Sequence, residues 1–385
     1  MSTTARSHPV VRQLRHDVND RPHLVVWEVT RACQLACKHC RADAQHLRDP
    51  RELSTSAGKA LLDDIAQSGQ PRPMVVISGG DAFERPDLSE LIEYGTSQGL
   101  AMSLSPSVTP LLTDAKLGEV RDAGVKAFSL SLDGATAATH DAFRGFAGTF
   151  DASIEAAQLI RKHGFRFQVN TTITADNVHE MPALLETVIG MGAQLWYTFF
   201  LIPVGRGTSM EPLAPRAMED VLNWLHDVSD RIAVKVTEAP AYRRLALQRE
   251  AARLNGTAMP ATGELHAELT ADTLARLGVC TQRRVPRPPI GVDAGRGFAF
   301  IDHIGQVFPS GFLPLPCGSV HDLPFSEIYR TSPTMQRLRR PTEFSGKCGV
   351  CEFSNICGGS RARTYAMTGD AFASDPSCLY EPSLA

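Results

Sequence analysis

The chain has 385 residues, of which 43% are hydrophobic and 21% are charged, and its formal net charge is −3. This composition is typical of a globular protein of two or three domains, and it excludes a disordered chain, a collagen-like repeat and a long coiled coil. The balance of 39 basic and 42 acidic residues gives no global electrostatic reason to expect nucleic-acid binding. The longest apolar run, residues 195–204, is about half as long as a membrane span. We therefore expect neither a nucleic acid nor a membrane as partner.

The amino-terminal residues 1–18 carry scattered charges and lack the apolar segment of a secretory signal, so we expect a cytoplasmic protein. The nine cysteines of such a chain indicate ligand or redox chemistry rather than disulfide bonds. Seven of them form two tight groups near opposite ends of the sequence, which suggests two separate metal sites.

Between residues 23 and 204, short β-rich runs alternate with amphipathic helical stretches. The predicted strands are 24–29, 74–78, 101–105, 127–133, 167–173 and 195–202, and helices are predicted between them, for example at 54–67 and 153–163. Apolar strands separated by helices predict a parallel sheet covered by helices. Six such units are too few for a closed eight-unit barrel, so we expect an α/β partial barrel or an open sheet with its chemistry at the C-terminal strand ends.

The pattern changes after residue 203. The predicted elements are a helix at 215–230, a strand at 232–238, a polar helical arm at 242–277, a Pro- and Arg-rich linker at 283–289, a β-hairpin at 297–311 that turns near 303–305, and a helix at 324–340. The predicted division is an N-terminal extension (1–22), the partial barrel (23–238), a helical arm with linker (239–290) and a C-terminal β-hairpin with a loop-rich, cysteine-bearing subdomain (291–385).

The first cysteine group, Cys33, Cys37 and Cys40, lies in the sequence VTRACQLACKHCRA directly after the first predicted strand. Soft thiolates select zinc or an iron–sulfur cluster. A closed structural zinc site normally has four protein ligands, whereas three ligands leave a position that a small molecule can fill. A four-iron cluster held by three cysteines exposes one iron, and a ligand bound to that iron can receive an electron from the cluster.

This CxxxCxxC spacing resembles the motif of the radical S-adenosylmethionine (SAM) enzymes. The resemblance implies a partial (β/α)6 barrel in which Cys33, Cys37 and Cys40 hold a [4Fe-4S] cluster and serve catalysis. In that family the open iron chelates SAM, and electron transfer cleaves SAM to methionine and a 5′-deoxyadenosyl radical that abstracts a hydrogen atom from the substrate. The resemblance also implies a reductant such as flavodoxin or ferredoxin.

Segments at the other predicted strand ends match further parts of the family pattern. The sequence SGGDAFERPDL resembles the family's GGE segment, in which Gly79 and Gly80 let the backbone approach a ligand closely and Asp81 accepts from the methionine ammonium. Here Asp replaces the usual Glu and Ala82 the usual Pro. The other SAM contacts that the resemblance implies are His39, Ser131, Asp133, Arg144 and Asn170.

The second cysteine group consists of Cys348, Cys351, Cys357 and Cys378. Four thiolates in a loop-rich tail make a complete metal site, although spacing alone does not separate zinc from iron–sulfur. The hairpin and the sequence CGVCEFSNICGGSRARTYAMTGD resemble the SPASM extension of radical SAM enzymes, which carries up to two auxiliary clusters. The four cysteines match one cluster, whereas Ser310 and Arg361 stand where the other needs cysteines. We therefore predict one auxiliary [4Fe-4S] cluster and treat Cys280 and Cys317 as free thiols.

The tail most resembles the radical SAM proteins that modify tetrapyrroles in alternative heme and heme d1 synthesis. Those proteins remove or alter propionate and acetate side chains, so the resemblance implies a tetrapyrrole substrate. The cations available for its carboxylates are Arg206, Arg243, Arg244, Arg361 and Arg363.

Two other functions stay open at this point. Peptide-maturing SPASM enzymes share these motifs and form thioether or carbon–carbon cross-links in ribosomally made peptides. The residues before His23 are too few for a leader-binding domain, which favours a small-molecule substrate or a separate peptide-binding partner. An iron–sulfur electron carrier or scaffold is the other alternative, but it needs no equivalent of Asp81, Asp133 or Arg144.

Overall fold

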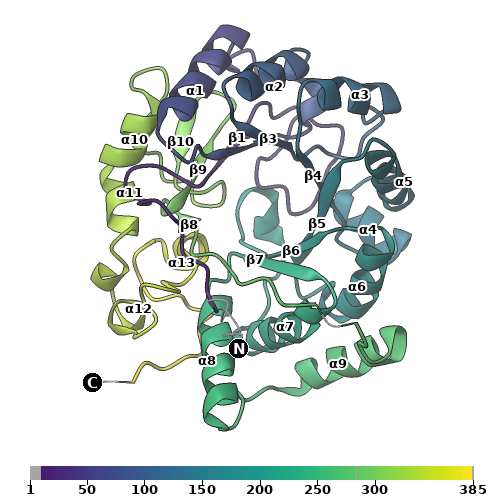
Figure 1. Cartoon of the computed structure of the whole chain (residues 1–385), viewed down its shortest axis with the longest axis vertical. Helices are drawn as coiled ribbons and strands as arrows, with labels where there is room; N and C mark the ends of the chain where they lie inside the picture. Colours follow the sequence, from purple (N-terminus) through teal and green to yellow (C-terminus); the bar gives the residue numbers. More distant parts are fainter. Residues whose placement is uncertain (1–9, 283, 384–385) are drawn as a thin grey trace, which may run out of the picture.

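Seven parallel strands form the central part of the protein, which is described here from a computed structural model for residues 10–282 and 284–383. The strands are β1 (Leu24–Glu28), β2 (Met74–Ser78), β3 (Ala101–Leu104), β4 (Ala127–Ser131), β5 (Arg166–Ile173), β6 (Leu195–Phe200) and β7 (Ala233–Thr237). They lie side by side in chain order and curve around a common centre (Figure 1). The predicted α/β partial barrel is confirmed.

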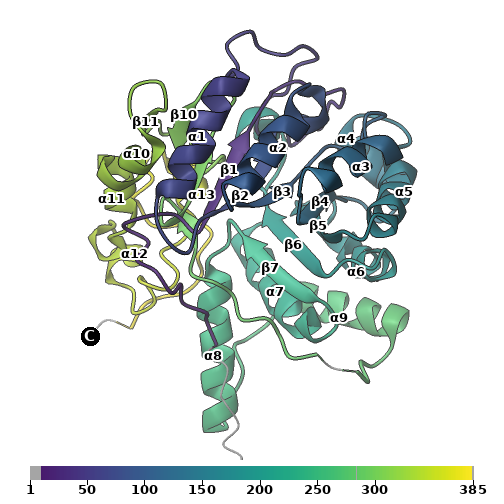
Figure 2. The same cartoon turned by 45° about the horizontal axis from the view of Figure 1, so that its top comes forward.

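Helices cover the outer face of this sheet (Figures 1 and 2). They are α1 (Thr55–Gln67), α2 (Leu88–Ser97), α3 (Asp114–Asp122), α4 (Ala137–Arg144), α5 (Thr149–Lys162), α6 (Met181–Gly190) and α7 (Pro215–Asp227). Helix α1 begins after Ser54, whose hydroxyl accepts from the amide of Ala57, a cap typical of this residue type. Alternate strand residues such as Val25 and Trp27 are fully buried in the core beneath the helices.

The opposite face of the sheet is only partly buried and carries many polar side chains. In β4 and β5, Ser131 pairs in register with Asn170, and Asn170 pairs with Tyr197 of β6. Because register partners in a parallel sheet share a face, these half-buried side chains line the inside of the barrel. The sequence alternation therefore places polar groups toward the barrel interior.

The C-terminal hairpin extends the same sheet. Strand β9 (Gly297–Ile301) pairs in parallel with β1, and β10 (Gln306–Phe308) returns antiparallel to β9. Two short strands, β8 (Asp293–Ala294) and β11 (Gly318–Ser319), flank this hairpin. The predicted hairpin and its turn are confirmed, and its strands continue the barrel sheet beyond β1.

Two predicted helical segments each contain two helices in the structure. The segment 324–340 forms α10 (Phe325–Thr331) and α11 (Pro333–Leu338), because Pro333 has no amide hydrogen to continue the first helix. The arm at 242–277 forms α8 (Ala241–Asn255) and α9 (Glu264–Leu277), and α9 packs on α6 and α7. The prediction of one continuous helix was wrong for 324–340, whereas the predicted helical arm consists of two helices.

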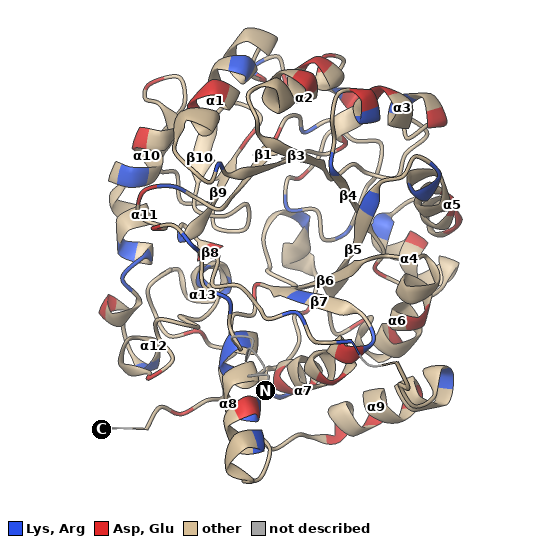
Figure 3. Cartoon of the chain, in the orientation of Figure 1, with Lys and Arg blue, Asp and Glu red and all other residues tan. Residues whose placement is uncertain are grey.

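The tail contains two further helices, α12 (Lys347–Val350) and α13 (Arg361–Thr368). Short 3-10 helices elsewhere in the described residues are η1 (Ala82–Glu84), η2 (Val178–Glu180), η3 (Gly205–Ser209), η4 (Val228–Asp230) and η5 (Pro341–Glu343). A small apolar cluster that includes Ile202, Leu313 and Ala362 packs α13 against the segment that follows β6. Acidic and basic residues are interspersed on the outer helices (Figure 3). Within the described residues, no helix combines the length and apolar character needed to span a bilayer.

Candidate active site

The first cysteine group lies in the loop that leaves the C-terminal end of β1. Cys33, Cys37 and Cys40 belong to one contact cluster, in which Cys33 and Cys37 are buried and Cys40 is half-buried. Two of the sulfurs accept hydrogen bonds from backbone amides. The amide of Leu35 donates to Cys33 Sγ at 3.4 Å, and the amide of Ala44 donates to Cys40 Sγ at 3.4 Å. Burial raises the pKa of Cys33 to about 11, so this thiol ionises when a metal compensates the buried charge.

The glycines after β2 pack directly against this cysteine loop. Gly80 donates to the carbonyl of Thr30 at 2.8 Å, and Asp81 donates to that of Ala32 at 2.7 Å. A Cβ atom on Gly80 would lie 2.4 Å from the Ala32 oxygen, and one on Gly79 would lie 2.8 Å from the Thr30 oxygen. In the structure these glycines approach the loop that carries the cysteines, and their approach to a ligand stays a prediction.

Arg206, in the segment after β6, binds the same loop from the other side. Its Nε donates to the carbonyl of Cys37 at 2.9 Å, its Nη1 donates to that of Ala44 at 3.1 Å, and its backbone amide donates to that of Cys40 at 3.0 Å. Sequence reasoning considered Arg206 for substrate carboxylates. The structure shows it as a support of the cysteine loop.

Asp81 is fully buried beside this loop. Its carboxylate accepts from the hydroxyl of Thr109 at 2.6 Å and from the amide of Phe83 at 3.1 Å. Burial raises the pKa of Asp81 to about 6, despite these hydrogen bonds. Nearby, Ser107 lies 3.5 Å from Cys33 Sγ and donates to the Gly80 carbonyl at 2.6 Å. Sequence reasoning missed Ser107 and Thr109, because no motif marks the loop between β3 and α3.

Asp133 and Arg144 form a buried ion pair next to Cys37. Arg144 also directs Nη1 toward Cys37 Sγ at 3.7 Å, whereas its buried Nε has no hydrogen-bond partner within the described residues. Asp133 accepts from the amide of Thr172 at 2.6 Å. Burial alone would raise the pKa of Asp133, but the charge of Arg144, together with His39, His140 and the amide of Thr172, holds that pKa below its ordinary value. A buried cation thus stands beside the proposed cluster ligands.

The other predicted SAM contacts lie near this pair. The rings of His39 and Phe143 are 4.6 Å apart, and Nδ1 of His39 is buried and lacks a partner within the described part of the chain. Burial lowers the pKa of His39 to about 4, so the imidazole is neutral near pH 7. Ser131 and Asn170 are half-buried neighbours on β4 and β5, and the Asn170 side chain accepts from Gln168 at 3.0 Å.

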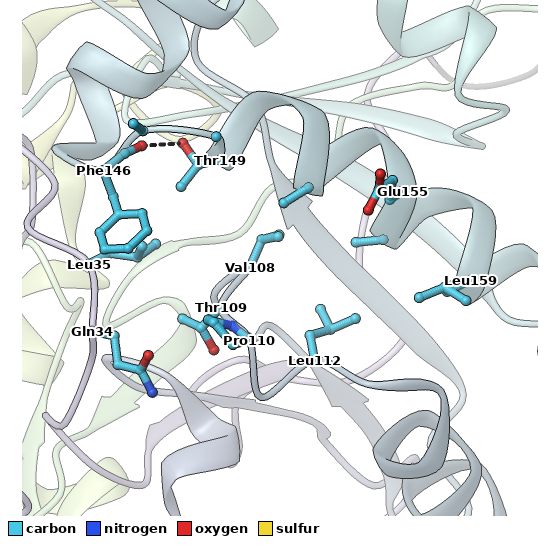
Figure 4. A pocket seen from close by; sticks show the side chains of 14 residues that line it. Gln34, Leu35, Val108, Thr109, Pro110, Leu112, Phe146, Thr149, Glu155 and Leu159 are labelled. Atoms are coloured by element: carbon cyan, nitrogen blue, oxygen red, sulfur yellow. Dashed lines mark hydrogen bonds between the residues drawn. The ribbon is translucent and has the colours of Figure 1, made fainter.

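A cavity of about 270 Å³ opens beside the cysteine loop (Figure 4). Gln34 and Leu35 of that loop line it together with Val108 and Phe146, and most of the lining is apolar. A smaller cavity is lined by Ser107, Ser131 and Arg144, together with Leu35 and Val108 of the larger one. The two adjoining cavities connect predicted SAM contacts with space suited to an apolar or amphipathic molecule.

The second cysteine group lies around α12 and the C-terminal tail. Cys348 is buried, and its Sγ accepts from the amide of Asp375 at 3.3 Å. Burial raises the pKa of Cys357 to about 12, and the adjacent Cys378 adds to this shift. Burial likewise raises the pKa of Cys351, to which Cys348 contributes. Cys351 therefore lies near Cys348, and Cys357 lies near Cys378.

No three His, Cys, Asp or Glu side chains among residues 10–282 and 284–383 are close enough together to bind a single metal ion. A four-iron cluster is wider than one ion, so its cysteine ligands need not meet at one point. The donor chemistry of both groups, cysteine thiols alone, suits iron–sulfur clusters.

Three of the arginines considered for substrate binding stabilise the fold instead. Arg361 donates to the carbonyls of residues 371 and 373 and toward Cys348 Sγ. Arg243 forms a 2.6 Å ion pair with Asp293, and Arg244 forms a 2.7 Å ion pair with Glu219. The two remaining cysteines are half-buried, Cys280 after α9 and Cys317 at the hairpin edge, where its thiol donates to Leu315.

Comparison with known proteins identifies the class. Residues 27–188 match the family model of the Radical SAM superfamily. The chain belongs to this superfamily and is an enzyme that uses SAM and a [4Fe-4S] cluster. It is 40% identical over 363 residues to an AdoMet-dependent heme synthase of Oleidesulfovibrio alaskensis, covering 93% of this chain and 87% of the relative. It is 39% identical over 382 residues to the AdoMet-dependent heme synthase of Nitratidesulfovibrio vulgaris, covering 98% of both chains.

A maturase is also among the similar proteins. The mycofactocin maturase MftC of Mycobacterium tuberculosis is 30% identical over 385 residues, covering 95% of this chain and 86% of the relative. The crystal structure of Streptococcus suis SuiB bound to SAM superposes with a TM-score of 0.65 at 14% identity, covering 93% of this chain and 77% of SuiB. This structural similarity supports the fold alone.

Proposed function

We propose that this radical SAM enzyme modifies a tetrapyrrole by abstracting a hydrogen atom from a carboxylate-bearing side chain. The observation that carries the proposal is the 39–40% identity to two AdoMet-dependent heme synthases along nearly the whole chain, C-terminal tail included. The largely apolar lining of the cavity beside the cysteine loop supports contact with an apolar part of the substrate.

The residues of the site have complementary roles in this proposal. Cys33, Cys37 and Cys40 hold the cluster, which supplies the electron that cleaves SAM when both are bound. Asp81 accepts from the methionine ammonium, and the free Nε of Arg144 donates to the methionine carboxylate. Asp133 keeps the guanidinium in place for this contact.

The side chains of the inner face surround the nucleoside in the same proposal. Ser131 and Asn170 supply polar contacts from adjacent strands, and the neutral ring of His39 lies beside the adenine. Gly79 and Gly80 hold the cysteine loop close to the end of β2, so the cluster and the SAM contacts keep a fixed relation.

We also propose one auxiliary [4Fe-4S] cluster held by the second cysteine group. The support is its thiol-only donor set and the side chains at the two positions that a second auxiliary cluster would need. Ser310 contacts the carboxylate of Glu238 at 3.5 Å, and the buried guanidinium of Arg361 is used by backbone carbonyls. Replacing Cys33, Cys37 and Cys40 together with Ala should leave about four irons per chain. An iron-free product would contradict the auxiliary site.

Flavodoxin or ferredoxin is the proposed reductant. The cytoplasmic location expected from the sequence stays a prediction, which fractionation of the native cells would test.

The test of the main proposal is turnover of an anaerobically reconstituted protein. Iron-coproporphyrin III, SAM and dithionite should yield 5′-deoxyadenosine together with a mass change at a propionate side chain. Turnover of a precursor peptide, with no change in any tetrapyrrole, would favour the peptide-maturase alternative. Failure of the fully loaded protein to cleave SAM with any candidate substrate would favour the electron-carrier alternative.

A further inference from the structure

Arg363, on α13, is among the largest fully buried side chains, with 1% of its surface exposed. Its Nη1 donates to the carbonyl oxygen of Glu238 at 2.7 Å. Its Nε and Nη2 are also buried, and neither has a hydrogen-bond partner in the described part of the chain. Folding has thus removed these two donors from water without pairing them.

These two nitrogens form one edge of the planar guanidinium, and their hydrogens point in the same direction. This edge matches the two oxygens of a carboxylate, which it binds through parallel hydrogen bonds. A buried donor without an acceptor is energetically costly, so two on one edge indicate an acceptor that joins after folding.

The neighbouring acidic groups are held by other partners. Glu238 accepts from the hydroxyl of Ser360 at 2.7 Å and from that of Ser310 at 3.5 Å. Asp375 accepts from the amides of Ser360 at 2.7 Å and Ser377 at 3.0 Å. These contacts keep both carboxylates in place around Arg363 while leaving its Nε and Nη2 edge free.

Arg363 differs in this respect from three other arginines that have an unpaired buried nitrogen. Arg144, Arg206 and Arg244 each have a single buried nitrogen without a partner among the described residues. Arg363 has two, and they lie on the edge suited to a carboxylate. The pattern points to a ligand rather than to imperfect packing of one donor.

The position of Arg363 fits a substrate contact. Glu238, whose carbonyl it binds, directly follows β7 at the C-terminal end of the strand. Ala362, its neighbour on α13, packs with Ile202, which follows β6. The cysteine loop leaves β1 at this same edge of the parallel sheet. Ser310, in contact with Glu238, occupies a position where the SPASM pattern has a cluster ligand.

We propose that Arg363 binds a carboxylate of the substrate through Nε and Nη2, and so selects substrates by their carboxylate side chains. The identity of that substrate as a tetrapyrrole rests on the proposed function. The carboxylate site itself does not, because it follows from the buried, unpaired edge.

The first experiment measures binding of coproporphyrin III to the holoenzyme by quenching of porphyrin fluorescence. We expect Arg363→Gln to weaken binding about tenfold to a hundredfold, the effect of losing charged hydrogen bonds. The tetramethyl ester, which lacks carboxylates, should bind the wild type and the variant equally. SAM affinity should not change, and its loss would assign the site to the SAM carboxylate and overturn the proposal.

Arg339→Gln is the matched control. This half-buried arginine donates to the carbonyls of Gly295 at 2.9 Å and Tyr329 at 2.6 Å, so its loss affects stability without touching the proposed site. Its porphyrin affinity should equal that of the wild type. Equal affinity of Arg363→Gln and the wild type for coproporphyrin III would overturn the proposal. If Arg363→Gln does not fold, Arg363→Lys replaces it, because lysine keeps the charge but lacks the planar edge.

A second experiment separates this inference from the proposed function. Propionate should raise the melting temperature of the wild type more than chloride does at equal ionic strength, and it should not do so for the Arg363 variant. If the wild type binds no porphyrin but shows this propionate effect, the carboxylate site stands and the tetrapyrrole assignment fails. An equal propionate effect in both proteins, or none in the wild type, would overturn the role of Arg363.

Discussion

Arg144 bridges Asp133 and Cys37, pairing with the carboxylate and directing Nη1 toward the sulfur at 3.7 Å. Helix α4 ends at Arg144, and Asp133 lies just past the end of β4. One guanidinium therefore fixes the cysteine loop relative to the strand that carries Ser131.

Removing the guanidinium should destabilise the protein and weaken SAM binding. Arg144→Gln leaves Asp133 as an unpaired buried carboxylate, so we expect a loss of about 3–5 kcal/mol in the free energy of unfolding. The apparent SAM requirement should also rise. Asp133→Asn with Arg144→Gln should recover part of the stability but not the SAM affinity. Denaturant unfolding and SAM titration measure the two effects, and unchanged SAM binding in Arg144→Gln would remove Arg144 from the SAM site.

Asp81 should make SAM binding dependent on pH. Because burial raises the pKa of Asp81 to about 6, the free protein holds the neutral carboxyl at lower pH, where it cannot pair with the methionine ammonium. SAM affinity should fall as the pH decreases through 6, and Asp81→Asn should bind weakly with this pH dependence lost. Calorimetric titration of anaerobic protein between pH 5 and 8 measures this, and a flat wild-type profile would contradict the contact.

The same group makes a prediction for the free protein. Its folded-state pKa lies above the unfolded value of about 3.9, so the folded state binds the proton more tightly. The contribution of Asp81 to stability should therefore decline as the pH rises from about 4 to 6. Asp81→Asn should show a smaller decline over this interval in urea unfolding experiments.

Gly80 should be intolerant of a side chain. A Cβ atom there would meet the backbone oxygens of Ala32 and Arg31 at 2.4 and 2.6 Å, and backbone cannot rotate away as a side chain does. We expect Gly80→Ala to cost about 1–3 kcal/mol and to lower the iron content of the first site. Gly118→Ala is the control. A Cβ atom at Gly118 would lie 3.9 Å from the nearest atom, in His163, and alanine is a better helix former than glycine at this position within α3. Equal stability and iron content in both variants would contradict the packing argument.

Sequence reasoning predicted the parts of the fold that depend on local pattern. Strands such as β2 and the cysteine loop after β1 follow from short runs of residues, so the partial barrel and the position of Cys33 could be predicted. The break at Pro333 was also available from sequence, because proline marks a helix start, and it was overlooked.

Contacts between residues far apart in the chain could not be predicted from the sequence pattern. The bond from Arg206 to the Cys37 carbonyl joins residues 169 positions apart, and no spacing rule connects them. The sequence likewise offered five arginines as equal candidates to bind a substrate carboxylate. In the structure, their hydrogen bonds distinguish Arg363 from Arg243 and Arg361. These differences arise from tertiary packing, because packing determines which guanidinium nitrogens already donate hydrogen bonds within the protein and which do not.

The most direct test of the account is the electron paramagnetic resonance spectrum of the reduced first cluster with and without SAM. A Cys348→Ala/Cys351→Ala variant, which lacks the auxiliary site, isolates that signal. Because SAM should bind the open iron of this cluster, we predict a cluster spectrum whose g values shift when SAM is added. A zinc ion at Cys33, Cys37 and Cys40, or a cluster spectrum that SAM leaves unchanged, would contradict it.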